Sequence, residues 1–100
     1  KRNMLIWGFP PEDIREVFSD ATFFHLSEGR NPRDKDKFKI IIGNDVANKV
    51  FDEKVKLRDK LIIQEQEFEV VGILEKRGNA PDDQSIYLPL ETMRDIFNEH

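Results

Sequence analysis

Few residues of this sequence could do chemistry, and the most suggestive group lies in the polar segment 75–85. Asp82 and Asp83 are adjacent there, and Arg77 precedes them on the same segment. Two neighbouring carboxylates can share a proton for acid–base catalysis or bind a cation. In a segment with glycine and proline, however, adjacent acidic residues usually form turns. We therefore favour turn formation, and keep a small ligand-binding or enzymatic site built from Arg77, Asp82 and Asp83 as the alternative.

A second acidic group, between residues 34 and 45, has the spacing of a calcium-binding loop but not its other features. Asp34, Asp36 and Asp45 stand near ligand positions, whereas Lys39 stands where such a loop needs glycine. Residues 40–42 are all isoleucine, which predicts a strand and not a loop. We therefore reject a calcium site.

The remaining residue types exclude further kinds of site. The only histidines, His25 and His100, lack a third metal ligand at a plausible spacing. The chain has no cysteine, which excludes a disulfide, a thiol nucleophile and a thiolate metal site. None of the five glycines belongs to a phosphate-binding pattern, and no serine has the surroundings of a catalytic nucleophile. We therefore expect no catalytic residue, no metal and no cofactor.

The composition indicates one small folded domain. The chain has 100 residues, of which 38% are hydrophobic and 36% are charged, and this length suits a single core. The formal net charge is −4, with basic and acidic residues intermixed, which argues against a nucleic-acid-binding module. No apolar run approaches the roughly 20 residues that a membrane-spanning helix needs.

The pattern of apolar residues predicts an α+β fold. We expect a single domain over residues 1–100, with a mixed β-sheet, a central hairpin and three short helices in the order β-α-β-α-β-β-β-α. The expected strands cover residues 4–8, 38–42, 61–63, 68–74 and 86–88, and the expected helices cover 10–18, 46–51 and 91–98. We expect the first strand to be buried and Asn44 or Asp45 to cap the second helix.

The hairpin over residues 61–74 is the clearest structural pattern. Its second strand is rich in valine and isoleucine, which suit a pleated sheet, and residues 64–67 form a short polar loop. Gly72 interrupts this strand, where glycine often marks a bulge or a close approach of backbone. Outside the hairpin, we expect a turn over residues 27–32, a solvated loop over 33–37 and an exposed loop over 75–85.

Five stretches together resemble the MacB-like extracytoplasmic (periplasmic) core domain of FtsX-like ABC transporter permeases. They follow one another in the order of that family and cover residues 6–10, 28–30, 40–51, 57–74 and 82–90. The residues that carry the signature are Gly8, Pro10, Gly29, Arg30, Gly43, Asp59, Gly72 and Pro89. Arg58 departs from the pattern, because the family usually has glycine before the aspartate. Arginine disfavours positive φ, so we expect this turn to be built differently without a change of fold.

The resemblance implies a role that the composition does not. Such domains lie outside the cell membrane, between the first two transmembrane helices of a permease that works with a cytoplasmic ATPase. They are not enzymes, and their permeases export or extract macrolides, peptides or lipoproteins, or transmit a mechanical signal. The chain resembles the C-terminal part of the core domain, excised from such a permease.

The implied partners are the rest of the permease with its transmembrane helices, the ATPase subunit, and an extracytoplasmic adaptor or a peptide or lipoprotein substrate. No nucleic-acid partner is expected. The candidate partner-contact loop contains Arg77, Asn79, Asp82 and Asp83.

Overall fold

The computed structural model describes residues 4–9, 25–31, 33, 35–78 and 83–97. The expected helix 10–18 lies outside these residues, as do Pro10, Asn79 and Asp82. The described elements are β1 (Leu5–Phe9), β2 (Leu26–Gly29), β3 (Lys39–Ile42), the π-helix η2 (Val46–Val50), β4 (Lys60–Ile63), β5 (Gln66–Leu74), β6 (Ser85–Pro89) and α3 (Leu90–Phe97).

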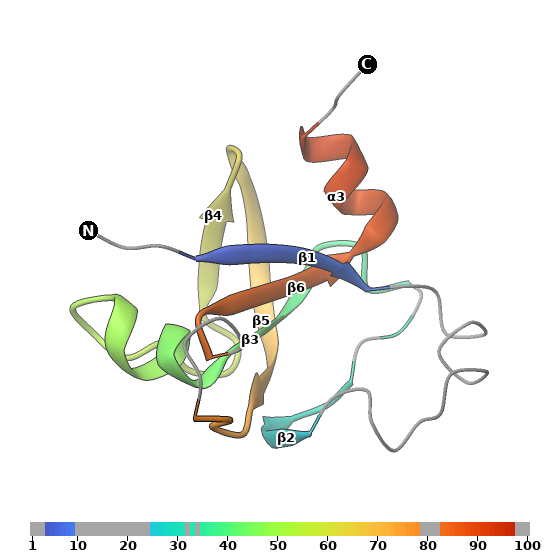
Figure 1. The fold of residues 1–100 in the computed structure, drawn as a ribbon. Helices are drawn as coiled ribbons and strands as arrows, with labels where there is room; N and C mark the ends of the chain where they lie inside the picture. The colour runs from blue at the N-terminus through green and yellow to red at the C-terminus, as the bar shows by residue number, and fades with distance from the viewer. Residues whose placement is uncertain (1–3, 10–24, 32, 34, 79–82, 98–100) are drawn as a thin grey trace.

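The strands form one mixed six-stranded sheet (Figure 1). Its strand order begins with β1 and continues with β6, β3, β5 and β2, while β4 pairs with β5. β1 is parallel to β6, and β3 is parallel to β5, whereas the other pairs are antiparallel. The α+β fold with a mixed sheet, predicted from the apolar pattern, is therefore confirmed.

The predicted hairpin is present, and its second strand is the centre of the sheet. Gln64 and Glu65 connect β4 to β5 with φ values of 51° and 67°, as the two central residues of a type I′ turn do. The loop is therefore shorter than the predicted 64–67. β5 is nine residues long and pairs with β2, β3 and β4, so three strands depend on its position.

The predicted bulge lies beside Gly72. Along the β3–β5 ladder, Ile40 pairs with Val70 but Ile41 pairs with Gly72, so Val71 is an extra residue. A Cβ atom on Gly72 would meet the Ile41 side chain and would lie 2.9 Å from the Arg30 carbonyl oxygen. Both features expected of this glycine, a bulge and a close approach of backbone, are confirmed.

Strand β2 replaces the turn that was expected from residue 27 onward. Leu26 pairs with Leu74 and Gly29 pairs with Gly72 in an antiparallel ladder, and the Arg30 N–H donates to the Val71 carbonyl at 3.0 Å. Serine, glutamate and glycine favour a turn locally, but the backbone groups of β5 supply hydrogen-bond partners that favour an extended chain. The turn prediction was wrong for residues 27–29 for this reason.

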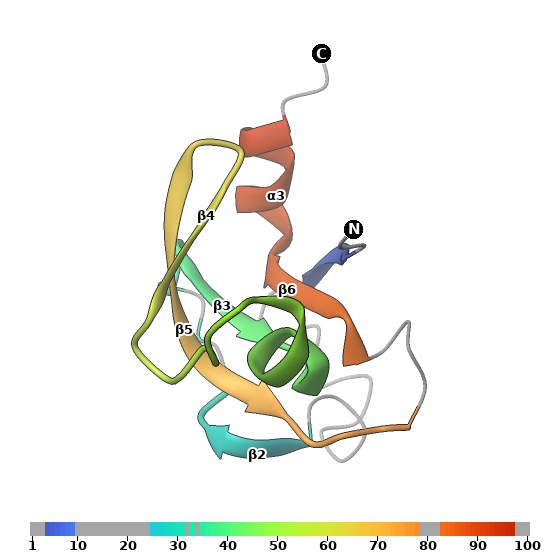
Figure 2. The ribbon, with the colours of Figure 1, turned by 90° about the vertical axis from the view of Figure 1, so that its left-hand side faces the viewer.

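One apolar cluster forms the core between the sheet and η2. Phe68, on β5, is fully buried and its ring meets that of Phe38 edge to face, with centroids 5.9 Å apart. η2 adds Val46 and Ala47 to the same cluster, and Figure 2 shows this helix lying against the sheet, away from α3. The other buried members are Ile40, Ile42, Val55, Val70, Ile73, Ile86 and Leu88.

The helix predicted over residues 46–51 has π geometry and begins without a side-chain cap. Asp45 occupies the N-cap position, but its side chain makes no capping hydrogen bond. The carboxylate instead lies 3.1 Å from Lys76 Nζ and 3.9 Å from Lys49 Nζ. The expected cap by Asp45 is therefore replaced by ion pairs, one of them to a residue far along the chain.

Arg58 adopts the backbone conformation that its side chain disfavours. Its φ is 75°, so the turn keeps the left-handed residue and is not built differently, as had been expected. Two hydrogen bonds to β5 hold it: the Arg58 N–H donates to the Val70 carbonyl at 2.8 Å, and the Val70 N–H donates to the Asp59 carbonyl at 2.9 Å. The pairing with β5 therefore outweighs the local cost of a positive φ.

Candidate functional site

Asp83 anchors the polar loop that was proposed as a contact surface. Its carboxylate accepts hydrogen bonds from the backbone N–H groups of Arg77, at 2.8 Å, and Gly78, at 3.0 Å. The residue is 1% exposed. Turn formation, favoured from the sequence, is what this carboxylate does, and its side chain is not available to a partner or ligand.

Lys76 ties the same loop to the start of η2. Its Nζ lies 3.5 Å from the Asp83 carboxylate and 3.1 Å from that of Asp45. The hydrogen bond to Asp45 raises the pKa of Lys76. Burial alone would raise the pKa of Asp83, but the two backbone N–H groups and the Lys76 ammonium outweigh it and hold the pKa below its ordinary value. The base of the loop is therefore an ionised cluster bound to the core.

Among the other contact candidates, the structure describes Arg77, which is exposed. Asn79 and Asp82 lie outside the described residues. The loop thus presents Arg77 to solvent next to the buried anchor Asp83. The prediction of Asp83 as a contact residue was wrong, because this side chain is buried. The spacing of two adjacent aspartates does not show which of the two carboxylates points inward.

Arg30, a signature residue, holds a second buried carboxylate. Its guanidinium donates to both oxygens of Asp36, at 2.7 and 3.3 Å, and the Arg33 N–H donates to the same side chain at 2.8 Å. Burial alone would raise the pKa of Asp36, but these hydrogen bonds lower it below its ordinary value. Asp36 is only 5% exposed, so the prediction of a fully solvated loop over residues 33–37 was wrong at this position.

The other described signature residues also have structural positions. The Gly43 N–H donates to the Ser85 carbonyl at 2.8 Å and its own carbonyl accepts from Ala47 at 3.2 Å, which joins β3, β6 and η2. Asp59 closes its turn by accepting from the Lys56 N–H at 2.8 Å. Pro89 ends β6 and precedes α3. These residues shape the fold and form no catalytic arrangement.

A polar hollow lies on the described surface. It has a volume of about 440 Å³, and its lining includes Glu28, Asn48, Lys54 and Lys56.

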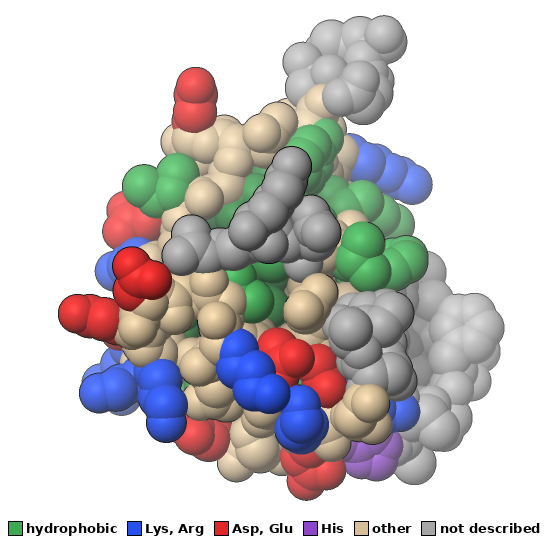
Figure 3. Space-filling model, turned by 60° about the vertical axis from the view of Figure 1, so that its left-hand side comes forward, with side chains coloured by type: hydrophobic (Ala, Val, Ile, Leu, Met, Phe, Trp, Pro, Cys, Tyr) green, Lys and Arg blue, Asp and Glu red, His purple; other side chains and the backbone are tan. Residues whose placement is uncertain are grey.

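Charged side chains of both signs are concentrated in the lower half of the face in Figure 3, whereas hydrophobic side chains are exposed in its upper half. Within the described ranges, no group of three or more His, Asp or Glu side chains could hold a metal ion.

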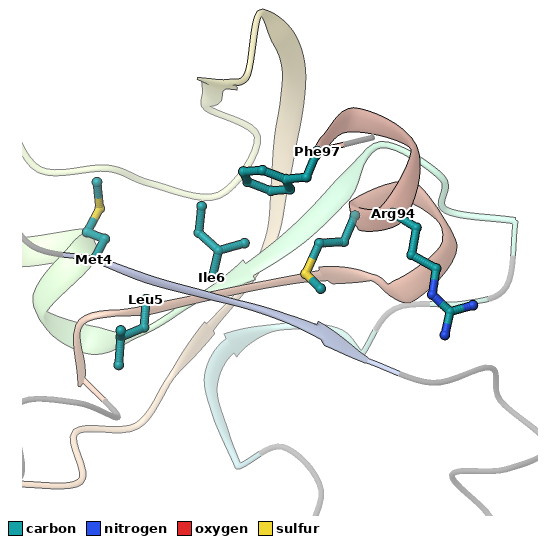
Figure 4. A pocket seen from close by; sticks show the side chains of 6 residues that line it. Met4, Leu5, Ile6, Arg94 and Phe97 are labelled. Atoms are coloured by element: carbon teal, nitrogen blue, oxygen red, sulfur yellow. The ribbon is translucent and has the colours of Figure 1, made fainter. Parts of the chain in front are cut away.

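Another hollow of the described surface is apolar and was not foreseen from the sequence. It is a groove of about 680 Å³ between β1 and α3, lined by Met4, Leu5, Ile6, Met93, Arg94 and Phe97. Figure 4 shows Ile6 and Phe97 on the same side of β1, with Leu5 on the opposite side.

The prediction of a buried first strand was therefore wrong, because Leu5 is 43% and Trp7 is 50% exposed. A wholly apolar strand indicates burial, but the sequence does not show whether its own fold or another segment covers it.

A further structural property concerns the membrane. None of the helices in the described part of the chain is both long and apolar enough to cross a bilayer.

Comparisons with known proteins identify the family. The family described as MacB-like periplasmic core domain matches residues 4–100. The uncharacterized ABC transporter permease MJ1507 of Methanocaldococcus jannaschii is 38% identical over 87 residues, which are 87% of this chain and 22% of that protein.

Two solved structures share the fold. The extracellular domain of the noncanonic ABC-type transporter YknZ from Gram-positive bacteria superposes with a TM-score of 0.65 at 22% identity, over 89% of this chain and 45% of that one. The periplasmic region of MacB from Actinobacillus actinomycetemcomitans superposes with a TM-score of 0.62 at 16% identity, over 90% and 40%. The chain thus spans less than half of each relative.

These matches agree with one another in sequence and in fold. The expected resemblance is confirmed, and so are the permease class and the extracytoplasmic side of the membrane that it implies. The chain belongs to the family of MacB-like periplasmic core domains of ABC transporter permeases.

Proposed function

We propose that residues 1–100 are the C-terminal part of the extracytoplasmic core domain of a longer permease. In this role the domain binds a substrate or a partner protein outside the membrane. It couples that binding to ATP-driven export or extraction of a macrolide, peptide or lipoprotein. ATP is hydrolysed on a separate subunit or domain, and the domain itself is not an enzyme.

The observation that carries this proposal is the family match over residues 4–100. The permease relative supports it, since its 87 aligned residues make up 22% of that protein. The geometry is consistent with a binding and coupling role. Its ionised groups Asp83 and Asp36 bind the chain's own backbone and Arg30, so they act as internal supports.

The loop 76–85 is our candidate contact surface within this function. Its base is fixed to the core through Asp83 and through the pairing of Lys76 with Asp45. A fixed base limits the conformational entropy that the exposed part loses when it binds. Arg77, Asn79 and Asp82 are the proposed contact residues, and Asp83 is the anchor that positions them.

The test is transport by the full-length permease carrying Arg77→Ala together with Asp82→Ala. A contact role predicts a fall in transport of about tenfold or more, in line with the loss of a central interface residue. Lys35→Ala, which removes another exposed charge, is the matched control and should leave transport unchanged. Unchanged transport by the double variant, at equal protein levels in the membrane, would exclude the contact role.

The alternative of a small ligand-binding or enzymatic site at Arg77, Asp82 and Asp83 is less well supported. The Asp83 carboxylate is already occupied by two backbone N–H groups. A real site would raise the melting temperature by mass action in a screen of metals and small molecules. A screen without any shift would speak for the transporter role.

A further inference from the structure

β1 has one edge that no described strand occupies. It is the first strand in the sheet order and, among the described strands, pairs only with β6, in parallel. The Leu5 N–H donates to the Gln84 carbonyl at 3.1 Å. Because alternate residues of a parallel ladder direct their N–H groups to the same neighbour, those of Ile6 and Gly8 point toward the other edge. Such an edge is a template for another strand.

The side chains of β1 carry none of the features that normally protect an edge strand. Its sequence, Leu-Ile-Trp-Gly-Phe, contains no charge and no proline, although exposed edges are usually blocked by such residues. Leu5 and Trp7 expose 43% and 50% of their surface on one face. On the other face, Ile6 borders the apolar groove that Met93 and Phe97 complete (Figure 4). Both faces are therefore apolar, as in the interior of a sheet.

Trp7 and Arg94 have side-chain groups that a partner could contact at this surface. The Trp7 indole N–H donates to Ser85 Oγ at 3.1 Å, so the polar atom of the ring is satisfied and its apolar part stays exposed. A half-exposed, oriented tryptophan is a frequent anchor of protein interfaces. Arg94 lies at the groove, and its side chain has no hydrogen bond or ion pair with any described residue. A partner with an acidic residue near the end of its strand would complement it.

The solved relatives indicate where such a strand would come from. About nine-tenths of this chain superposes on each of them, yet it covers 45% of the YknZ domain and 40% of the MacB region. More than half of each folded extracytoplasmic chain is therefore additional polypeptide attached to the same fold.

We propose that an extended segment of the same permease polypeptide, from outside residues 1–100, adds as a further strand to the edge of β1 that no described strand occupies. Its backbone pairs with the N–H groups of Ile6 and Gly8, in the mode of β-strand addition. Its apolar side chains cover Leu5 and Trp7 on one face and enter the groove on the other. This inference rests on the proposed function only in that it requires the longer permease.

The first experiment measures thiol accessibility in the full-length permease in membranes. Leu5→Cys and Trp7→Cys are labelled with a hydrophilic maleimide and compared with Phe38→Cys, because Phe38 is 42% exposed and matches Leu5. Ile62→Cys, at a position 74% exposed, gives the rate of an open site. Labelling of the permease without an introduced cysteine is subtracted.

Strand addition predicts labelling at Leu5→Cys and Trp7→Cys at least about tenfold slower than at Phe38→Cys, since the reagent must wait for local opening. Equal rates in a chain that is retained in the membrane would overturn the proposal and leave the proposed function intact. A full-length chain that is not retained in the membrane would overturn both.

A second experiment distinguishes a strand from other covers. Hydrogen exchange of the same full-length protein is followed in the peptide that contains β1. An added strand protects the Ile6 and Gly8 amides as well as those bonded to β6. Slow labelling of the thiols combined with fast exchange at Ile6 and Gly8 would overturn strand addition, and would assign the groove to an apolar ligand, lipid or packed side chains.

Discussion

Gly29 and Gly72 face each other where β2 meets β5, and neither has room for a methyl group. They are paired residues of the antiparallel ladder. A Cβ atom on Gly29 would lie 2.8 Å from the Gly72 Cα atom and would also meet the Val71 carbonyl oxygen. The close contact with the backbone of β5 therefore requires glycine at position 29. Position 72 requires glycine because a Cβ atom there would meet the Ile41 side chain and the Arg30 carbonyl oxygen.

Gly29→Ala should destabilise the domain strongly. The substituted residue would have a φ of 87° and would collide with backbone atoms that cannot rotate away, so we expect a loss of roughly 2–4 kcal/mol. Gly78→Ala is the matched control, because Gly78 has a φ of 88° but nothing within 4 Å of its Cβ position. It should cost only about 1–2 kcal/mol. Denaturant titration measures both, and equal losses would refute the steric explanation.

Asp83→Ala should loosen the loop 76–85 and lower stability. The variant leaves the backbone N–H groups of Arg77 and Gly78 without their acceptor, at a cost of about 1–3 kcal/mol. Asp95→Ala, at an exposed position of α3, should change stability by less than about 0.5 kcal/mol. Limited proteolysis should show faster cleavage within the loop of Asp83→Ala. An unchanged cleavage rate would contradict the anchoring role.

Stability should fall in strong acid because of Asp36 and Asp83. Both have a folded-state pKa below the ordinary value of 3.8. As the pH falls into this range, the unfolded state therefore binds more protons than the folded state. Their contribution is therefore complete above the ordinary carboxyl pKa and is lost as the pH falls through the lower folded-state values. Asp36→Asn and Asp83→Asn should each flatten the dependence of the unfolding free energy on pH in this range. Profiles parallel to the unsubstituted protein would contradict the assignment.

Arg58→Gly should stabilise the domain. Arg58 has a φ of 75°, where glycine avoids a local cost of about 1–2 kcal/mol but loses more backbone entropy on folding. We expect a net gain of roughly 0.5–1 kcal/mol in the unfolding free energy. Arg58→Ala keeps the unfavourable conformation and removes only the exposed side chain, so it should gain nothing. An equal gain in the unfolding free energy of both variants would show that loss of the arginine charge, and not relief of the backbone conformation, causes the stabilisation.

The sequence by itself determined the parts of this protein that depend on local patterns. The valine and isoleucine residues of β5 and the polar turn before it favour a hairpin. Gly72 marks the bulge because glycine alone tolerates the close approach of Arg30. The absence of cysteine and the intermixed charges are compositional facts that no fold can alter.

Only the tertiary structure decided which polar residues turn inward and which apolar residues remain outside. Leu26–Gly29 became a strand because β5 offered it backbone partners. Asp36 and Asp83 became buried because Arg30 and the N–H groups of Arg77 and Gly78 came within hydrogen-bonding distance. Leu5 and Trp7 of β1 stayed about half exposed because the described fold does not fully cover their side chains. The pairing of β2 with β5 joins residues distant along the chain. Arg30 and Asp36, and Arg77 and Asp83, are six residues apart, so their contacts depend on how the intervening loop is folded, which composition does not show.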